Sequence, residues 1–440
     1  MCNIFDVCLI GLGPAGIGFL SSIDTPIMKS IICFEKGTVT SLCNCHKNIG
    51  SICTHCNPCH IISGLGGAAR FSCGKISAYP AGSGLIPFFD SNDSLESFMK
   101  DKLELLSAEL NFKKFVVPKT VQINMKDYFN NNGIIYKYYD VYEFENKAYY
   151  SYINKIVNNA KRNGVQLFFE TEVTKISKEN CNDNSVFVIN TKSNNQECSY
   201  YARKLVFATG NIYQSVNTIE MLTDKKSNFF YELGVRISVP TEKLIPYLNA
   251  HGDLKLKYKM GRTYCVSKNG HIIAYSVNNS IFLEGYVDVL QPTKVSNFAV
   301  IFKDNNLSEL KKFKKLYNTI FDGVPIQQKY SDYINKVCSV LDFNQPFFPV
   351  QNGDINMLFS NDFNKMLIEF IDSVLINSLC LSTDDITLFA PELKETYAFD
   401  VNKNFQITKG IYIIGASTGK FRGILQSMSS GILCGKRIWG

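Results

Sequence analysis

The fold of this chain is decided near its start, by the stretch Asp6-Val7-Cys8-Leu9-Ile10-Gly11-Leu12-Gly13-Pro14-Ala15-Gly16. Residues 6–10 predict a short buried strand, and Ile17-Gly18-Phe19-Leu20 continues as a helix. A second buried strand is predicted at Ile31-Ile32-Cys33-Phe34 and ends at Glu35. A strand, a GxGxxG turn, a helix and a second strand ending in an acid are typical of a dinucleotide-binding unit.

Each residue of the glycine motif has a physical role in such a unit. Gly11 permits a tight turn, Gly13 leaves room for a pyrophosphate, and Gly16 lets the helix pack on the strand. Pro14 and Ala15 stand at the helix N-terminus, which offers unpaired N–H groups and partial positive charge to phosphates. We expect Glu35 to accept hydrogen bonds from a ribose.

Length and composition are those of a globular protein with a sizeable core. The chain has 440 residues, of which 45% are hydrophobic and 19% charged, and its net charge is +7. We expect a cytoplasmic protein without a signal peptide, because the first strand begins within a few residues of Met1. No apolar run is long enough to span a membrane, and the mild charge only weakly suggests a nucleic-acid partner. In a reducing compartment the 15 cysteines do not indicate a disulfide scaffold.

Several of these cysteines fall in one stretch with three of the five histidines. The run Cys53-Thr54-His55-Cys56-Asn57-Pro58-Cys59 has two-residue spacings that let thiolates converge on one metal. We predict a metal site formed by Cys53, Cys56 and Cys59 with Cys45 or a nearby histidine, holding zinc rather than an iron–sulfur cluster. Two alternatives are a redox-active thiol pair near a flavin and a loop without bound metal.

The rest of the chain is ordered around the first strands. A glycine-rich turn covers residues 63–72, and strands are expected at 165–169, 172–176, 185–189 and 204–210. Helices are expected at 94–112 and 147–163, and β-rich segments dominate from about residue 228 to 385. Residues 410–415 predict a strand that returns to the nucleotide-binding sheet, followed by a helix at 423–438. No second GxGxxG appears in the sequence.

These motifs resemble those of the FAD-dependent dehydrogenases of the glutathione-reductase-like Rossmann class. The best match is the poorly characterised bacterial and archaeal group of FAD-dependent oxidoreductases. Besides the first glycine motif, the resemblance rests on residues 64–75, on Arg262-Thr263-Tyr264-Cys265 with Ser296-Asn297-Phe298-Ala299, and on residues 415–426. It implies an α/β fold, in which a Rossmann-type FAD-binding domain is built from discontinuous segments and carries an inserted α+β substrate domain.

The implied domains and cofactor contacts can be assigned to residues. The FAD-binding domain comprises residues 1–80, 140–225 and 386–440, with a helical insertion at 81–139 and a substrate domain at 226–385. Beyond the first motif and Glu35, the expected FAD contacts are Gly66, Gly67, Val173, Thr209, Gly210, Gly415, Ala416, Arg422, Gly423 and Ile424. Two positions depart from the family: Cys73 replaces its Asp, and Ala416 replaces the acidic residue after the last strand.

The resemblance implies an FAD-dependent oxidoreductase that passes a hydride or electron pair between flavin N5 and a small-molecule substrate. The candidate catalytic residues are Arg70, Cys73, Lys75 and Cys265, joined by Lys420 and Arg422 as cations for an anionic substrate or reduced flavin. Electrons come from the substrate, from an electron-transfer or substrate-carrying partner protein, or from a transient nicotinamide. Two alternatives are a flavoprotein acting on RNA or DNA and a non-catalytic redox or metal sensor.

Overall fold

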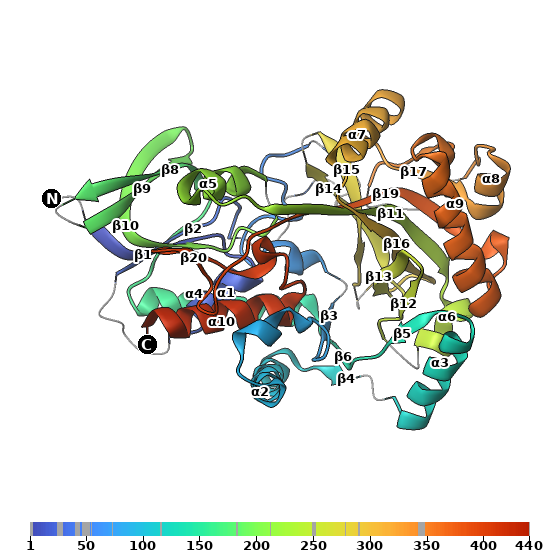
Figure 1. Ribbon diagram of the computed structural model, residues 1–440, viewed down its shortest axis with the longest axis horizontal. Helices are drawn as coiled ribbons and strands as arrows, with labels where there is room; N and C mark the ends of the chain where they lie inside the picture. Colours follow the sequence, from blue (N-terminus) through green and yellow to red (C-terminus); the bar gives the residue numbers. More distant parts are fainter. Residues whose placement is uncertain are drawn as a thin grey trace.

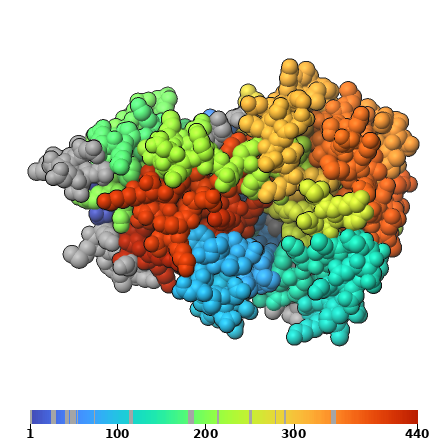
Figure 2. Space-filling view, in the orientation of Figure 1, coloured from blue at the N-terminus to red at the C-terminus, as the bar shows by residue number. Residues whose placement is uncertain are grey.

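The computed structural model describes residues 3–23, 30–39, 45, 53, 55–72, 74–114, 117–181, 184–211, 213–248, 252–277, 279–288, 291–341 and 348–439. Two large sheets dominate these residues, and Figure 1 shows them at opposite ends of the molecule. Long strands connect the two halves. In the space-filling view the two lobes lie side by side, the first mainly red and green and the second orange, yellow and teal (Figure 2).

The first sheet contains the predicted nucleotide-binding strands. Its order is β20 (Gln406–Thr408), β21 (Ile411–Ile413), β10 (Gln196–Phe207), β1 (Ile4–Ile10), β2 (Ile31–Phe34) and β7 (Gln166–Phe168). The five strands from β21 to β7 are parallel. A hairpin of β8 (Glu172–Cys181) and β9 (Asn184–Ser193) pairs with the start of β10. The expected α/β fold with a discontinuous Rossmann-type sheet is therefore confirmed.

Helices cover the first sheet and define its core. On one face, α1 (Pro14–Leu20) packs against α10 (Ile424–Trp439) and α4 (Asn146–Arg162), with α2 (Asn92–Leu110) outside them. The contact between α1 and α10 is very close, since a Cβ on Gly431 would collide with the carbonyl oxygen of Ala15. A separate core cluster contains Val216 and Ile219 of α5 (Tyr213–Thr223), a helix that also contacts β8. Apolar residues such as Val7, Leu9 and Val206 fill the space between the sheet and the helices.

The second sheet is almost wholly antiparallel. Its order is β18 (Gln351–Asn352), β17 (Ile326–Lys329), β19 (Thr387–Ala398), β11 (Asn228–Pro240), β16 (Val295–Asp304), β13 (Gly261–Ser267), β12 (Lys255–Tyr258) and β5 (Ile135–Lys137). Smaller sheets are formed by β14 (His271–Val277) with β15 (Ser280–Tyr286), and by β3 (Lys75–Ser77), β6 (Val141–Glu143) and β4 (Lys113–Lys114).

A second core joins this sheet to its own helices. These helices are α3 (Lys119–Asn131), α6 (Thr241–Leu248), α7 (Leu307–Phe321), α8 (Tyr330–Asn335) and α9 (Asn361–Phe370), the last continuing as wider turns to Ser378. The stretch 81–139 is divided between two cores: α2 packs with the first, while Phe129 and Tyr136 from α3 and β5 belong to the second. Strand β19 also lies in the second sheet. Within the described residues, no helix has the length and apolarity needed to cross a membrane.

Candidate functional site

The parallel strands place four predicted segments at one edge of the first sheet. Ile10 is in register with Phe34 and with Phe207, and Phe207 is in register with Ile413. The residues that follow these positions therefore meet at the carboxyl ends of the strands, where open α/β sheets bind ligands. Gly11, at the first of these ends, has a φ of 97°, which a residue with a side chain rarely adopts.

Glu35 ties three backbone segments together at this edge. Its Oε2 accepts a hydrogen bond from the N–H of Leu12 at 2.8 Å. Its Oε1 accepts from the N–H groups of Gly37 and Gly64, each at 2.9 Å. The side chain thus holds the first glycine motif against the second glycine-rich turn. It also lines the cavity described below. Among the described residues Oε2 accepts one hydrogen bond, from Leu12, so it has capacity to accept another from a ribose hydroxyl.

Gly13 opens toward empty space. A Cβ built on this residue meets no other atom of the described residues within 4 Å, and its backbone is extended, with φ −68° and ψ −175°. By contrast, a Cβ on Gly67 of the second glycine turn would stand 3.1 Å from the Cα of Gly13. The two turns therefore lie against each other and leave free room in front of the α1 N-terminus.

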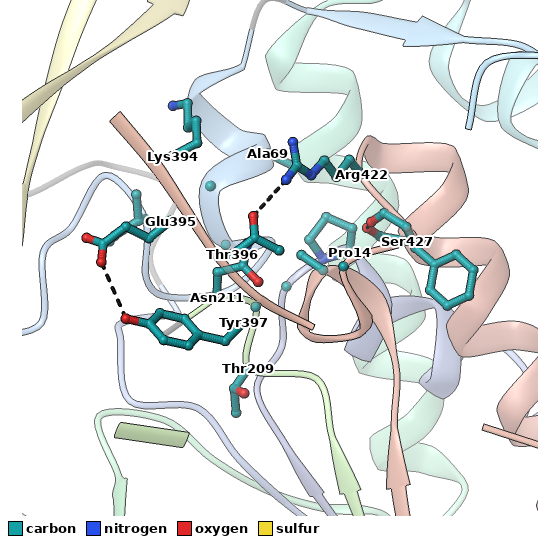
Figure 3. Close-up of a pocket in the computed structure, with 18 of the residues that line it drawn as sticks. Pro14, Ala69, Thr209, Asn211, Lys394, Glu395, Thr396, Tyr397, Arg422 and Ser427 are labelled. Carbon is teal, nitrogen blue, oxygen red and sulfur yellow. Dashed lines mark hydrogen bonds between the residues drawn. The ribbon is translucent and has the colours of Figure 1, made fainter. Parts of the chain in front are cut away.

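Two buried polar atoms at this edge have no hydrogen-bond partner among the described residues. They are Oγ1 of Thr209 and Oδ1 of Asn211, just after β10. Figure 3 shows both side chains at the pocket together with Pro14, Thr396 and Arg422. The loop that carries them is itself held, because Ser417 Oγ donates to the carbonyl of Gly210 at 2.6 Å. Buried polar atoms are normally satisfied, so these two point to a polar ligand.

The start of α10 forms a further wall of the site. Gln426 is buried, and its Nε2 donates to the carbonyls of Ser77 and Ala81, both at 3.0 Å. This amide anchors the first turn of the helix to the segment after β3. Gly423 and Ile424 at the start of this helix line the same cavity, and a helix N-terminus favours a ligand that carries negative charge.

These features border one cavity of about 2040 Å³ between the two lobes. Sites for drug-sized ligands occupy roughly 300–1,000 Å³, so the cavity has room for a dinucleotide and a second molecule. Most of the predicted cofactor residues line it: Gly11, Gly13, Pro14, Ala15, Glu35, Gly67, Val173, Thr209, Gly210, Ala416, Arg422, Gly423 and Ile424. Gly16, Gly66 and Gly415 lie outside its lining and support the backbone behind it.

Two of the candidate catalytic cations, Lys75 and Arg70, form contacts with other residues of the protein. Lys75 lines the cavity, but its side chain is 5% exposed and its Nζ lies 3.0 Å from Oδ1 of Asp253. Arg70 lies outside the lining, and its Nη2 donates to the carbonyls of His60 and Ser63. Lys75 therefore joins the two lobes, while Arg70 fixes the segment before the second glycine turn.

Cys265 does reach the cavity. It has a φ of 50° and stands in a register irregularity between Tyr264 and Ser267 on β13. A non-glycine residue in this region stores strain of about 1–3 kcal/mol, and such strain gathers at functional sites. The other predicted thiol, Cys73, lies outside the described residues.

The predicted metal site receives no support from the described residues. Among them, no three His, Cys, Asp or Glu side chains are placed to hold a metal ion. Cys45 and Cys59 are buried in a small apolar cluster with Ile61 and Ile273, and Cys53 packs against a second cluster. Only Cys56 and Cys59 of the four predicted ligands line the cavity. Neighbouring Thr54 and His46 lie outside the described residues.

Two networks of charge involve the second lobe, and their carboxylates, Glu232, Glu284 and Glu392, lie outside the sequence motifs. Glu232 is buried and accepts from both Arg262, at 2.5 Å, and Arg422. Burial opposes ionisation of Glu232, but these two guanidinium groups outweigh it and lower its pKa. Arg236 is fully buried and donates to Glu392 at 2.7 Å.

The second network reaches the cavity through two further side chains. Glu284 and Lys394 form an ion pair that lines it, and Lys394 also lies 3.7 Å from the buried Glu392. Burial opposes ionisation of Glu284 as well, yet Lys394 and Arg236 hold its pKa below the usual range. Asn211 could have been found from the sequence, since it directly follows the predicted Thr209-Gly210 turn. The ion pairs come from antiparallel strands that carry no motif.

Comparisons with known proteins were made for the whole chain. No family model and no curated protein matches it. Among solved structures it is similar to a flavoprotein/dehydrogenase from Cytophaga hutchinsonii, with 14% identity and a TM-score of 0.39 over 99% of this chain and 78% of that one. A glycine oxidase from Geobacillus kaustophilus gives 11% identity and a TM-score of 0.41, over 99% and 95% of the two chains. A p-nitrophenol 4-monooxygenase from Pseudomonas putida gives 10% and 0.36, over 95% and 73%. At scores this low we draw no conclusion about function from these likenesses.

Proposed function

We propose that the protein is an FAD-dependent oxidoreductase acting on a small molecule held between its two lobes. The observation that carries the proposal is the set of unsatisfied polar atoms on Thr209 and Asn211 beside the open face of Gly13. The residues present fit FAD: a glycine turn with room for a pyrophosphate, an acid beside it, and a second helix N-terminus across the cavity. FAD, when bound, supplies hydride or electron-pair transfer.

The chain's own residues then have distinct tasks. The α1 N-terminus and Gly13 bind the phosphates, and Glu35 orients the ribose with its remaining lone pair. The α10 N-terminus, whose residues Gly423 and Ile424 line the cavity, would favour negative charge on a bound flavin. The second lobe covers the cavity and limits the access of water. We propose that Cys265 contacts the substrate, because its strained backbone holds it at the cavity wall.

The proposal is tested by removing the two unsatisfied polar groups. We expect Thr209→Val and Asn211→Leu each to weaken FAD binding by about fivefold to tenfold, since a lost hydrogen bond costs roughly 1 kcal/mol. The matched control is Thr223→Val, whose hydroxyl donates to Ile219 on α5 and lies outside the cavity lining. Reconstitution of the apoprotein with FAD measures the dissociation constants. Unchanged affinity in both variants would refute the placement of the cofactor.

Catalysis is tested separately on the FAD-loaded protein. Under anaerobic conditions, a true substrate bleaches the spectrum of oxidised flavin, and an electron acceptor restores it. A protein that binds FAD but exchanges electrons with no donor, dithionite included, would fit a non-catalytic role instead.

A further inference from the structure

The part of the cavity wall that is formed by strands β5, β12 and β13 of the second lobe is cationic. Four side chains of these strands line it with positive charge, namely Lys137, Lys255, Lys257 and Arg262, and Lys75 and Arg422 of the first lobe line the same cavity. Two buried carboxylates pair with some of these side chains, Asp253 and Glu232. Asp253 is shared by Lys75 and Lys255, and Glu232 by Arg262 and Arg422. No carboxylate among the described residues lies within ion-pair distance of Lys137 or Lys257.

Strand pairing concentrates this charge on one face. Lys255 on β12 stands directly opposite Lys137 on β5, and Lys257 stands directly opposite Arg262 on β13. Like charges placed directly opposite each other on a sheet destabilise it. A bound anion lying over these two neighbouring pairs would offset the repulsion between their charges.

The same face offers one aromatic surface among the cations. Lys255 Nζ lies 4.9 Å from the centroid of the Tyr264 ring, and the guanidinium carbon of Arg262 lies 5.0 Å from the same centroid. The side chain of Lys255 is 22% exposed and that of Arg262 is 31% exposed, so both charges are partly shielded from solvent. A cleft lined by one sign of charge with low-dielectric walls concentrates ions of the opposite sign.

We propose that this cationic wall binds the acidic groups of the substrate, which is a small molecule carrying several carboxylate or phosphate charges. The inference rests on the proposed function, because it assigns the substrate half of the cavity and leaves the glycine-turn half to FAD. Lys137 and Lys257 contact the acidic groups directly, and Arg422 marks the end of the wall next to the α10 N-terminus. A small ligand fits better than a nucleic acid, since Lys75, Lys255 and Arg262 are at least partly buried between the lobes, while Lys137 and Lys257 are exposed parts of the same lining.

The test is calorimetric titration of the FAD-loaded protein with pyrophosphate in one arm and citrate in the other. We expect the preferred anion to bind about tenfold more weakly to the Lys137→Gln/Lys257→Gln variant, which loses two charge-assisted contacts. The control is Lys119→Gln/Lys126→Gln, which removes two exposed lysines of α3 outside the cavity lining. Stronger binding of pyrophosphate identifies a phosphorylated substrate, and stronger binding of citrate a polycarboxylate.

Other results of this titration would contradict either the anion site or the proposed FAD-dependent function. If neither anion binds, or if both variants weaken binding equally, the cationic wall is not a binding site. An anion that displaces FAD has bound at the cofactor phosphate site, which also contradicts the inference. A protein without FAD that still binds the anion through Lys137 and Lys257 would refute the proposed function and keep the anion site.

Discussion

The backbone N–H of Leu12 donates a hydrogen bond of 2.8 Å to Oε2 of Glu35, 23 residues further along the chain. The same carboxylate accepts from Gly37 and Gly64, so one side chain fixes both glycine turns. Glu35, the acid after the second strand, therefore positions the two glycine turns of the proposed cofactor site in the protein without FAD.

Replacing Glu35 tests this structural role. We expect Glu35→Gln to lower the free energy of unfolding of the FAD-free protein by about 1–3 kcal/mol, because a buried N–H loses its acceptor. Urea unfolding of the apoprotein measures the change. Glu197→Gln, an exposed position on β10, is the control. Equal stability of the two variants would show that Glu35 does not organise the turns.

Substitutions of two of the three glycines in the first motif are expected to cause different defects. Gly13→Val should fold with wild-type stability yet lose FAD binding, because its side chain enters the space kept for the pyrophosphate. Gly16→Val should not fold, since a Cβ there would collide with the carbonyl oxygen of Gly11. Circular dichroism and FAD titration separate the two defects. Full FAD affinity in Gly13→Val would contradict the assignment of this face.

Cys265 allows the backbone and the thiol to be tested separately. Cys265→Gly relieves the positive φ of 50°, so we expect stability to be maintained or raised slightly. If the thiol contacts substrate, this variant and Cys265→Ser both reduce the rate of flavin reduction and leave FAD binding unchanged. Rapid mixing under anaerobic conditions measures that rate. If both variants reduce flavin at the wild-type rate, Cys265 has only a structural role in the β13 irregularity and does not contact the substrate.

Ionisation of Asp253 is expected to make the free energy of unfolding decrease as the pH falls. Burial opposes its ionisation, but Lys255, Lys75 and the Tyr139 hydroxyl hold its pKa well below the usual range. Because the folded pKa is depressed, the stabilisation is complete above the unfolded value and is lost as the pH falls below about 4. We expect Asp253→Asn to be less stable than wild type at pH 7, with a difference that narrows toward pH 3.

Urea unfolding at several pH values measures that difference. A gap between wild type and Asp253→Asn that stays constant or widens in acid would contradict the ion-pair network. Lys243→Gln serves as the control, since Lys243 pairs with Asp385 away from the cavity lining and is half exposed.

The sequence predicts the first sheet well because its signals are local. Gly11 adopts a positive φ, Gly13 leaves space in front of the backbone, and Glu35 supplies a carboxylate, so each residue type follows from a local requirement and the motif identifies them without any contact information. The helix at residues 423–438 and the strand at 410–415 were expected for similar reasons, and they correspond to α10 and β21.

The second lobe is harder to predict because its site residues meet through long-range pairing. Lys137 and Lys255 are brought opposite each other by β5 and β12, and Lys75 meets Asp253 across the two lobes. Nothing in the short patterns around these residues encodes such partners. The cysteine run misleads for a related reason: close spacing allows thiols to converge but does not require it, and Cys59 is buried among apolar side chains instead.

We propose that the cavity at the carboxyl edge of the first sheet holds FAD. The most direct measurement is the visible absorption spectrum of the purified protein, with the released flavin identified and quantified after denaturation. We predict an oxidised-flavin spectrum and FAD at one equivalent per chain, after reconstitution if the protein is purified without it. Protein that remains colourless and binds no FAD on reconstitution, while folded by circular dichroism, would contradict the claim.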